Sequence, residues 1–258
     1  MADEIRYELK DAGIAVVTLN RPAKLNAINA ALTLAFAAIV KRIEADPAVR
    51  VVILTSSSER AFCVGADLAA LAAGEGPQLL TADGGLAGFT HAARRKPWIA
   101  AVRGRAMGGG LELALGCDMI VAADDAQFGL PEPAHGVIAA AGGVTRLSNA
   151  IPRHIANELI ATGALIGAER AYALGLVNRV VPAATLFDAA LELAQAIARN
   201  APLAVQEALA LSREAAQLDE TAAFAASLRA VDRLRDTEDF AEGPRAFVEK
   251  RAPVWRGR

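Results

Sequence analysis

Two glutamates stand in sequence settings that suit proton transfer. Glu112 comes two residues after the run Gly108-Gly109-Gly110, and Glu132 lies between Pro131 and Pro133. The prolines restrict the backbone around Glu132 and hold it on a rigid turn. A pair of carboxylates suits a reaction in which one moves a proton onto or off carbon while the other acts on water. Taken alone, each glutamate is equally well explained as a surface carboxylate.

Two glycine turns predict unpaired backbone amides that would serve the same reaction. In residues 61–68 a short strand leads through Gly65 into a helix, with Asp67 in the first helical turn. In residues 102–112 the glycine run lets the backbone approach a ligand and leaves amides free at a helix start. Such amides stabilise an oxygen that gains negative charge. The glycine run matches neither a phosphate loop nor a dinucleotide-binding fingerprint. Ordinary strand–helix packing remains the alternative for both turns.

The histidines and cysteines give weaker indications. His135 lies three residues beyond Glu132 and either touches a substrate and tunes that carboxyl or simply bonds to backbone. His91 and His154 are interpreted as ordinary helix residues. Cys63 and Cys117 match no metal or redox spacing, so we expect two buried free thiols, a reducing compartment and no metal site.

The elements that must position these residues alternate between strands and helices. The apolar patterns predict strands at residues 5–9, 14–19, 49–54, 98–102, 119–122 and 177–181. Helices are predicted from Asn29 as N-cap to Asp46-Pro47, and at residues 109–116, 145–150, 154–162, 168–174 and 186–199. This order indicates βαβ crossovers and a largely parallel sheet. Because ligands gather at the carboxyl ends of parallel strands, both amide turns and both glutamates are expected to follow strands of the same sheet.

Two segments depart from the alternation. Residues 74–85 are rich in Gly, Pro and Asp and are interpreted as a mobile loop, which we expect to shape a substrate pocket together with residues up to 95. Residues 202–250 are predicted to form three helices without a strand. The chain is therefore expected to consist of an α/β core, residues 1–198, which contains the site, and a helical region, residues 199–258.

Composition narrows the functional classes. The chain of 258 residues is long enough for a substantial core, and its formal charge of −2 comes without a basic patch, which argues against a nucleic-acid partner. The first residues show no apolar segment of signal-peptide type, and no uncharged apolar run approaches the roughly 18 residues of a membrane span. We therefore expect a cytoplasmic protein without a membrane partner.

Several motifs in order resemble the crotonase (enoyl-CoA hydratase/isomerase) superfamily over nearly the whole chain. The strongest are the 61–68 segment, the Gly-Gly-Gly-x-Glu run and Phe-Gly-x-Pro-Glu at 128–132. Further matches are Arg21-Pro22 with Leu25-Asn26-Ala27, Gly142-Gly143 with Arg146-Leu147, and the segment 242–251. Each motif alone is unspecific, but the order and spacing of the motifs together make the resemblance specific.

The resemblance implies an α/β fold, a repeated ββα spiral with a C-terminal helical region that packs in a homotrimer, often paired into a hexamer. Carried over by position, it makes Glu112 and Glu132 the catalytic pair and gives the oxyanion-hole amides to Ala66 and Gly109. It also implies an acyl-CoA thioester as substrate, with no cofactor apart from the CoA of the substrate itself. The positions that correspond to CoA contacts are Lys24, Leu25, Ala61, Gly65, Asp67, Leu68 and Lys250.

Because both glutamates are present, the resemblance predicts a hydro-lyase: an enoyl-CoA hydratase that adds water reversibly across the 2,3 double bond. The alternative within the class is the carnitinyl-CoA dehydratase branch, which residues 84–90, Leu130-Pro131-Glu132 and 253–258 resemble. An aromatic cage would favour that cationic substrate, yet the chain has only two Trp and two Tyr. A non-catalytic acyl-CoA binder and an RNA-binding homologue are the alternatives of another class; the balanced charge and the intact glutamate pair argue against them.

Overall fold

A six-stranded sheet forms the body of the protein in this computed structural model, which describes residues 4–215 and 217–258. The strand order is β1-β2-β3-β7-β9-β12, and only β1 and β2 pair antiparallel, across the 3-10 turn Asp11–Gly13. The predicted strands lie within two residues of those observed. Their bounds are β1 Ile5–Lys10, β2 Ile14–Leu19, β3 Val51–Ser56, β7 Trp98–Val102, β9 Met119–Ala123 and β12 Arg179–Val181.

A second sheet of four very short strands, in the order β11-β10-β8-β4, lies beside the first. Strands β4, β8 and β10 run parallel, and β11 pairs antiparallel with β10. Each of the parallel strands follows a strand of the large sheet: β3 leads to β4 and helix α2, β7 to β8 and α3, and β9 to β10. This repetition is the predicted ββα spiral. The bounds are β4 Ala61–Cys63, β8 Arg105–Met107, β10 Gln127–Gly129, β11 Ile166–Gly167, α2 Leu68–Ala72 and α3 Gly109–Gly116.

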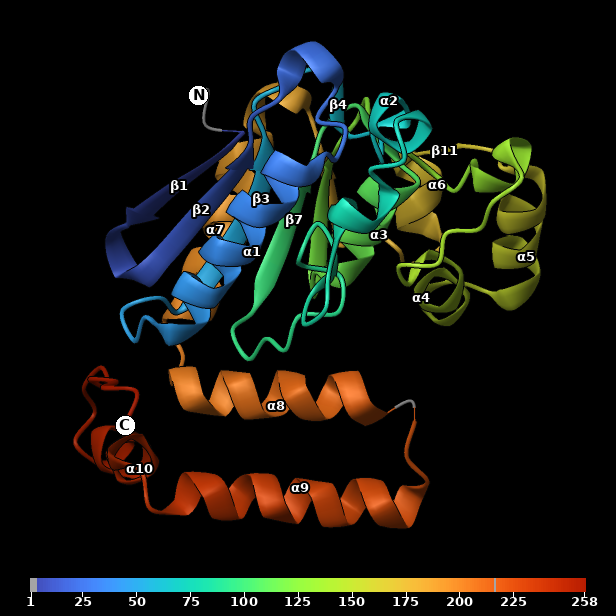
Figure 1. Ribbon diagram of the computed structural model, residues 1–258. Helices are drawn as coiled ribbons and strands as arrows, with labels where there is room; N and C mark the ends of the chain where they lie inside the picture. The colour runs from blue at the N-terminus through green and yellow to red at the C-terminus, as the bar shows by residue number, and fades with distance from the viewer. Residues whose placement is uncertain (1–3, 216) are drawn as a thin grey trace.

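Helices cover both faces of the large sheet (Figure 1). Helix α1 (Ala30–Ala45) packs on the face that continues into the second sheet, and the Asn29 side chain caps it as predicted by accepting from the Leu32 amide. Helix α7 (Leu186–Ala198) packs against the opposite face. Alternate residues of the buried strands therefore face α1 and α7, which explains why these strands are apolar throughout.

The segment predicted as a mobile loop has regular structure of its own. A 3-10 turn at Gly76–Leu79 leads into a hairpin of β5 (Leu80–Thr81) and β6 (Gly85–Leu86). Leu79 and Phe89 are buried, and the Phe89 ring stacks on Phe36 with centroids 4.9 Å apart. The loop prediction was therefore wrong for these residues, because a few buried apolar side chains anchor a backbone whose glycines and proline suggested only mobility.

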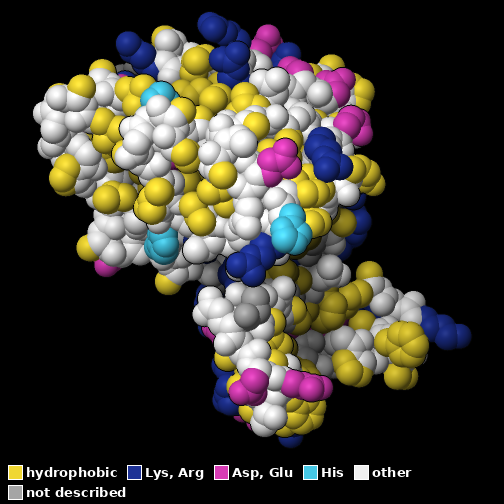
Figure 2. All heavy atoms as spheres, turned by 90° about the vertical axis from the view of Figure 1, so that its right-hand side faces the viewer, with side chains coloured by type: hydrophobic (Ala, Val, Ile, Leu, Met, Phe, Trp, Pro, Cys, Tyr) yellow, Lys and Arg dark blue, Asp and Glu magenta, His cyan; other side chains and the backbone are white. Residues whose placement is uncertain are grey.

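The three predicted C-terminal helices form an arm beside the body (Figures 1 and 2). They are α8 (Pro202–Ala215), α9 (Glu220–Arg235) and α10 (Glu238–Val248). Ion pairs connect the arm to the body: Arg213 of α8 binds Asp118, and Glu207 of α8 binds Arg95 of the body as well as Arg233 of α9. Within the described ranges, none of the helices has the length and hydropathy that a membrane span needs. The division into residues 1–198 and 199–258 stays a prediction.

Candidate active site

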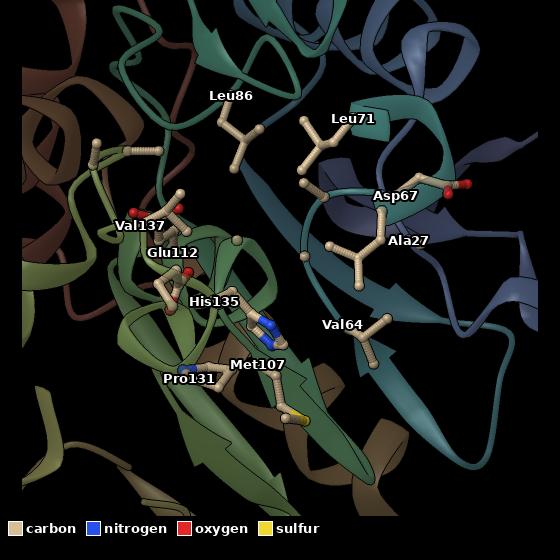
Figure 3. A pocket seen from close by; sticks show the side chains of 18 of the residues that line it. Ala27, Val64, Asp67, Leu71, Leu86, Met107, Glu112, Pro131, His135 and Val137 are labelled. Carbon is tan, nitrogen blue, oxygen red and sulfur yellow. The ribbon is translucent and has the colours of Figure 1, made fainter. Parts of the chain in front are cut away.

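A cavity of about 800 Å³ opens where the short parallel strands β4, β8 and β10 end (Figure 3). The hairpin segment forms one wall, and the chain between β10 and helix α4 (Gly143–Ala150) forms another. Ala66, Gly109, Glu112 and Glu132 all line it. The prediction that these residues follow strands of one sheet is therefore correct, but the sheet is the short second one rather than the one whose strands the sequence indicated.

Backbone contacts hold the two amide turns against each other. Gly65 has φ +88°, and a Cβ on it would lie 2.9 Å from the Gly109 nitrogen, so only glycine permits this approach. Ile28 clamps the first turn, since its amide donates to the Gly65 carbonyl and its carbonyl accepts from Asp67, each at 2.8 Å. In the part of the chain that the structure describes, neither the Ala66 nor the Gly109 amide has a hydrogen-bond partner. Both donors are thus available to a ligand.

Glu112 is almost completely buried on α3, with 3% of its surface exposed. Its Oε1 accepts a hydrogen bond of 2.9 Å from the amide of Gly143, at the start of α4. Burial raises the pKa of this carboxyl, the Gly143 amide opposes that rise, and the charge of Glu132 adds to it. A solvated surface role for Glu112 is therefore excluded.

Glu132 opens the 3-10 turn Glu132–His135 that follows β10. Its Oε2 is buried and has no hydrogen-bond partner among the described residues, and its Oε1 would lie 2.7 Å from a Cβ on Gly108. Burial raises the pKa of this carboxyl, while its own backbone amide and the charge of His135 lower it. A buried carboxyl oxygen without a partner is poised to exchange a proton with a bound molecule.

The predicted CoA contacts divide into two groups. Lys24, Gly65, Asp67 and Leu68 line the cavity. Ala61 is instead buried inside β4, Leu25 borders a separate hollow of about 350 Å³, and Lys250 lies exposed after α10 on the arm. The single chain therefore brings the residues predicted to be catalytic and to form the oxyanion hole together with four of the predicted contact positions, but not with the other three.

The side chain of Asp67 has partners within the protein. Its carboxylate accepts from Arg21 at 2.8 Å and caps α2 by accepting from the Ala69 amide. The hydrogen bond from Arg21 lowers the pKa of Asp67. Figure 3 shows the carboxylate turned away from the cavity. Only the backbone of Asp67 is left to face a ligand.

Sequence reasoning missed much of the cavity lining. We predicted a helix at His91, but this residue lies in a turn after the hairpin, where it lines the cavity. His135 lines it too. Apolar side chains complete the lining, and in Figure 3 Leu71 and Leu86 point toward each other. They are Leu71, Leu80, Leu86, Val137 and Ile138. The glycines at 84, 85 and 88 were the one available signal that residue 91 follows a turn.

The side chains and amides that line this cavity suit acid–base chemistry. A buried and a partly buried carboxyl, both with raised pKa values, line the same cavity as two free amides, so the site suits proton transfer beside an oxygen that becomes negative. Among residues 4–215 and 217–258, no three His, Cys, Asp or Glu side chains are grouped to hold a metal ion.

Comparisons with known proteins agree with this geometry. Residues 9–258 match the family model described as enoyl-CoA hydratase/isomerase. Carnitinyl-CoA dehydratase from Proteus mirabilis (strain HI4320) is 43% identical over 247 residues, 94% of each chain. The same-named enzyme from Escherichia coli (strain K12) is 42% identical over 254 residues, 96% of this chain and 97% of its own.

Among solved structures, that of enoyl-CoA hydratase from Mycobacterium tuberculosis H37Rv superposes with a TM-score of 0.94 at 41% identity, covering 99% of this chain and 100% of its own. The fold, the order of the motifs and the level of identity lead to one conclusion. The chain belongs to the enoyl-CoA hydratase/isomerase family, the crotonase family that its motifs resemble, and is an enzyme of the hydratase and dehydratase type.

Proposed function

We propose that the protein catalyses the reversible addition of water to a 2-enoyl-CoA, giving a 3-hydroxyacyl-CoA. One observation carries the proposal: the buried Glu112, the partly buried Glu132 and the two free amides line the same cavity. A hydration needs a base for water, an acid for carbon, and a site for negative charge on the thioester oxygen. These four groups supply each of those needs.

In the proposed mechanism the Ala66 and Gly109 amides donate to the thioester oxygen. Glu112, as carboxylate, takes a proton from water as the water oxygen bonds to C3. The electron pair of the double bond moves toward the carbonyl, and the resulting enolate is stabilised by the two amides. Glu132, in its acid form, then gives its proton to C2. The reverse reaction exchanges these roles. One oxyanion donor typically contributes about 10²–10³ in rate, so two suffice for a large share of the acceleration.

The CoA part of the substrate is assigned to the open side of the cavity. Lys24 is exposed there and lines the cavity, which supports a contact with an anionic or polar part of CoA. The carboxylate of Asp67 is already bound to Arg21, so its contribution is assigned to the backbone. Lys250 lies on the arm and is assigned to the CoA phosphate of a neighbouring copy.

We also propose that copies of the chain assemble into a trimer through the arm. Its helices expose large apolar side chains that a monomer would leave in water, and Figure 2 shows apolar atoms gathered on the arm. They are Phe224, Leu228, Val231, Phe247 and Val248. We further propose that two such trimers can pair into a hexamer.

The test is the hydration of short 2-enoyl-CoA thioesters, followed as the loss of absorbance of the conjugated thioester. Turnover is expected in the native assembly. Glu132→Gln should lower kcat by at least about 10²-fold, the lower end for general acid–base catalysis. Glu158→Gln, on an exposed face of helix α5 (Arg153–Thr162), is the matched control and should keep the wild-type rate. Absence of turnover in a folded assembly would refute the proposal.

Dehydration of a carnitinyl-CoA thioester is the second candidate. It is favoured by the relatives of that name at 42–43% identity over nearly the full chain. Against it, the residues that line the cavity include no Phe, Tyr or Trp to surround a trimethylammonium group. Comparing kcat/KM for crotonobetainyl-CoA and crotonyl-CoA decides between the two substrates.

A further inference from the structure

His91 lines the cavity, and its side chain is exposed. It follows the hairpin, and its backbone amide donates to the Gly84 carbonyl at 2.9 Å. The preceding residue, Thr90, accepts through its carbonyl from Arg146, which also donates to the Ala141 carbonyl of the opposing wall. The charge of Arg146 reaches Glu112 and lowers its pKa. Arg146 thus connects the turn that carries His91 to the surroundings of Glu112, where we expect the acyl group to extend beyond C3.

The hydrogen bonds around Thr90 determine which nitrogen of the imidazole carries the hydrogen. The buried Thr90 hydroxyl accepts from the Leu86 amide at 3.1 Å and lies 3.1 Å from Nδ1 of His91. A buried hydroxyl must place its own hydrogen on an acceptor, and among the described residues Nδ1 is the one within reach. Nδ1 therefore accepts, and the hydrogen of the neutral ring is on Nε2.

Gly85 keeps this arrangement in place. A Cβ on Gly85 would lie 2.6 Å from Nδ1 of His91 and 2.8 Å from Oγ1 of Thr90. With φ +64°, residue 85 also has a backbone that side-chain-bearing residues rarely adopt. The ring is thus held by Thr90 on one edge, and its Nε2 edge has no hydrogen-bond partner in the described chain.

Most side chains that share the cavity with this donor are apolar. Leu80 and Leu86 belong to the hairpin, Ile138 lies on the opposing wall, and the remaining charged groups of the cavity have other tasks. Asp67 is paired with Arg21, and Glu112 accepts from the Gly143 amide. An exposed N–H donor beside apolar side chains can select a ligand, because a ligand that displaces water from His91 without offering an acceptor leaves the donor unpaired.

We infer that His91 is a specificity-determining residue, which donates from Nε2 to an oxygen on the acyl group beyond C3. The inference rests on the proposed function of the cavity. It names the substrate class as enoyl thioesters whose acyl chain carries a hydroxyl, carbonyl or carboxylate oxygen. The same N–H presents positive charge density to the acyl end, so it disfavours a trimethylammonium group there.

The experiment measures binding of saturated thioesters, which requires no turnover. Calorimetry on the native assembly compares 4-hydroxybutanoyl-, 5-hydroxypentanoyl- and 6-hydroxyhexanoyl-CoA, each with the alkyl thioester of equal length. At the length that places oxygen against His91, the hydroxyl compound should bind about fivefold tighter, the value of one net hydrogen bond. A Kd ratio near one at every length would overturn the inference.

Variants of His91 separate a hydrogen bond from a general effect on shape. His91→Phe should bring the Kd ratio of alkyl to hydroxyl thioester to one. His91→Gln, which keeps an N–H donor, should retain a preference for the hydroxyl thioester. His91→Glu should bind 4-(trimethylammonio)butanoyl-CoA about tenfold tighter than wild type does, because a carboxylate attracts the cation. His154→Phe, an exposed histidine of α5, is the matched control and should leave every ratio unchanged. If His91→Phe keeps the wild-type ratio, the inference fails.

Failure of the inference and failure of the proposed function give different results. If the protein hydrates 2-enoyl-CoA but the Kd ratio does not change when His91 is replaced, only the specificity role is refuted. A hydroxyl preference that depends on His91, without hydration of any thioester, refutes the hydratase proposal and keeps the specificity role.

Discussion

The carboxyls of Glu112 and Glu132 are held in surroundings that disfavour their charged forms. Glu112 is packed between α3 and the start of α4, and one amide, that of Gly143, compensates it. Glu132 has a buried oxygen without a hydrogen-bond partner among the described residues. Burial raises both pKa values, so each carboxyl keeps its proton to a higher pH than a surface glutamate would. A raised pKa favours the acid form that the proposed hydration requires of Glu132.

The raised pKa of Glu112 predicts how its replacement affects stability at different pH values. A carboxyl whose pKa is higher in the folded than in the unfolded state contributes stability below the unfolded value, about 4.3. That contribution is lost as pH rises through the folded pKa. Glu112→Gln removes this titration, so the unfolding free energy of the variant should rise relative to that of wild type as the pH rises above about 4.3, the unfolded value.

Urea unfolding at several pH values measures this difference. Glu158→Gln, whose side chain is exposed on α5, controls for a change of net charge alone. Parallel curves for wild type and Glu112→Gln across the pH range would contradict the assignment.

The contact between α3 and β4 decides whether the two amides and Glu112 share one cavity. Gly110 makes this contact: a Cβ there would lie 1.9 Å from the Cys63 carbonyl oxygen. Both partners are backbone, so neither can rotate away. The position of the helix that carries Glu112 therefore depends on the absence of one methyl group.

Gly110→Ala should lower the unfolding free energy by about 3 kcal/mol or abolish folding, because overpacking against rigid backbone is among the costlier core changes. Gly167→Ala is the matched control. Its new methyl would meet nothing within 4 Å, so a change within about 0.5 kcal/mol is expected. Chemical denaturation of both variants provides the measurement. Equal stability of the two would show that α3 can shift away from β4.

For secondary-structure elements, the sequence predicts the long elements better than the short ones. Strands β1, β2, β3, β7 and β9 and helices α1, α3 and α7 could be predicted because their apolar patterns extend over five or more residues. Strands β8, β10 and β11 have two or three residues and show no periodicity, so the sheet that carries the site went unnoticed.

The site shows the same limit. Glu112 and Glu132 could be named from motifs, because prolines and glycines mark them. The bond from Gly143 to Glu112 spans 31 residues, and the pairing of Asp67 with Arg21 spans 46. Long-range contacts of this kind depend on tertiary packing and are absent from local patterns, which is why the role of His91 was also missed.

Considered as a whole, the molecule has a well-packed body and an arm attached mainly through ion pairs. Glu207 of α8 binds Arg95 of the body and Arg233 of α9 with a carboxylate that is largely buried, and these partners lower its pKa. Helices α9 and α10 expose several large apolar side chains, and 85% of the surface of Phe247 is exposed. An arm of this composition is expected to be covered by another copy.

Light scattering should therefore give the mass of a trimer or hexamer. Phe247→Asp should produce monomers, because a carboxylate cannot be buried in an apolar interface without a partner. Leu34→Asp, on an exposed position of α1 in the body, is the control and should not produce monomers. A wild-type protein that elutes and scatters as a monomer would contradict the assembly proposal.

The hairpin of β5 and β6 has a consequence for how this enzyme can diversify. It is inserted between α2 and β7, and the strand ends that carry the amides and the glutamates lie outside it. The proposed proton chemistry and part of the acyl wall are therefore encoded in separate stretches of the gene. We expect changes confined to residues 74–95 to alter the acyl preference while the reaction stays the same, which makes this insertion a suitable target for grafting and laboratory evolution.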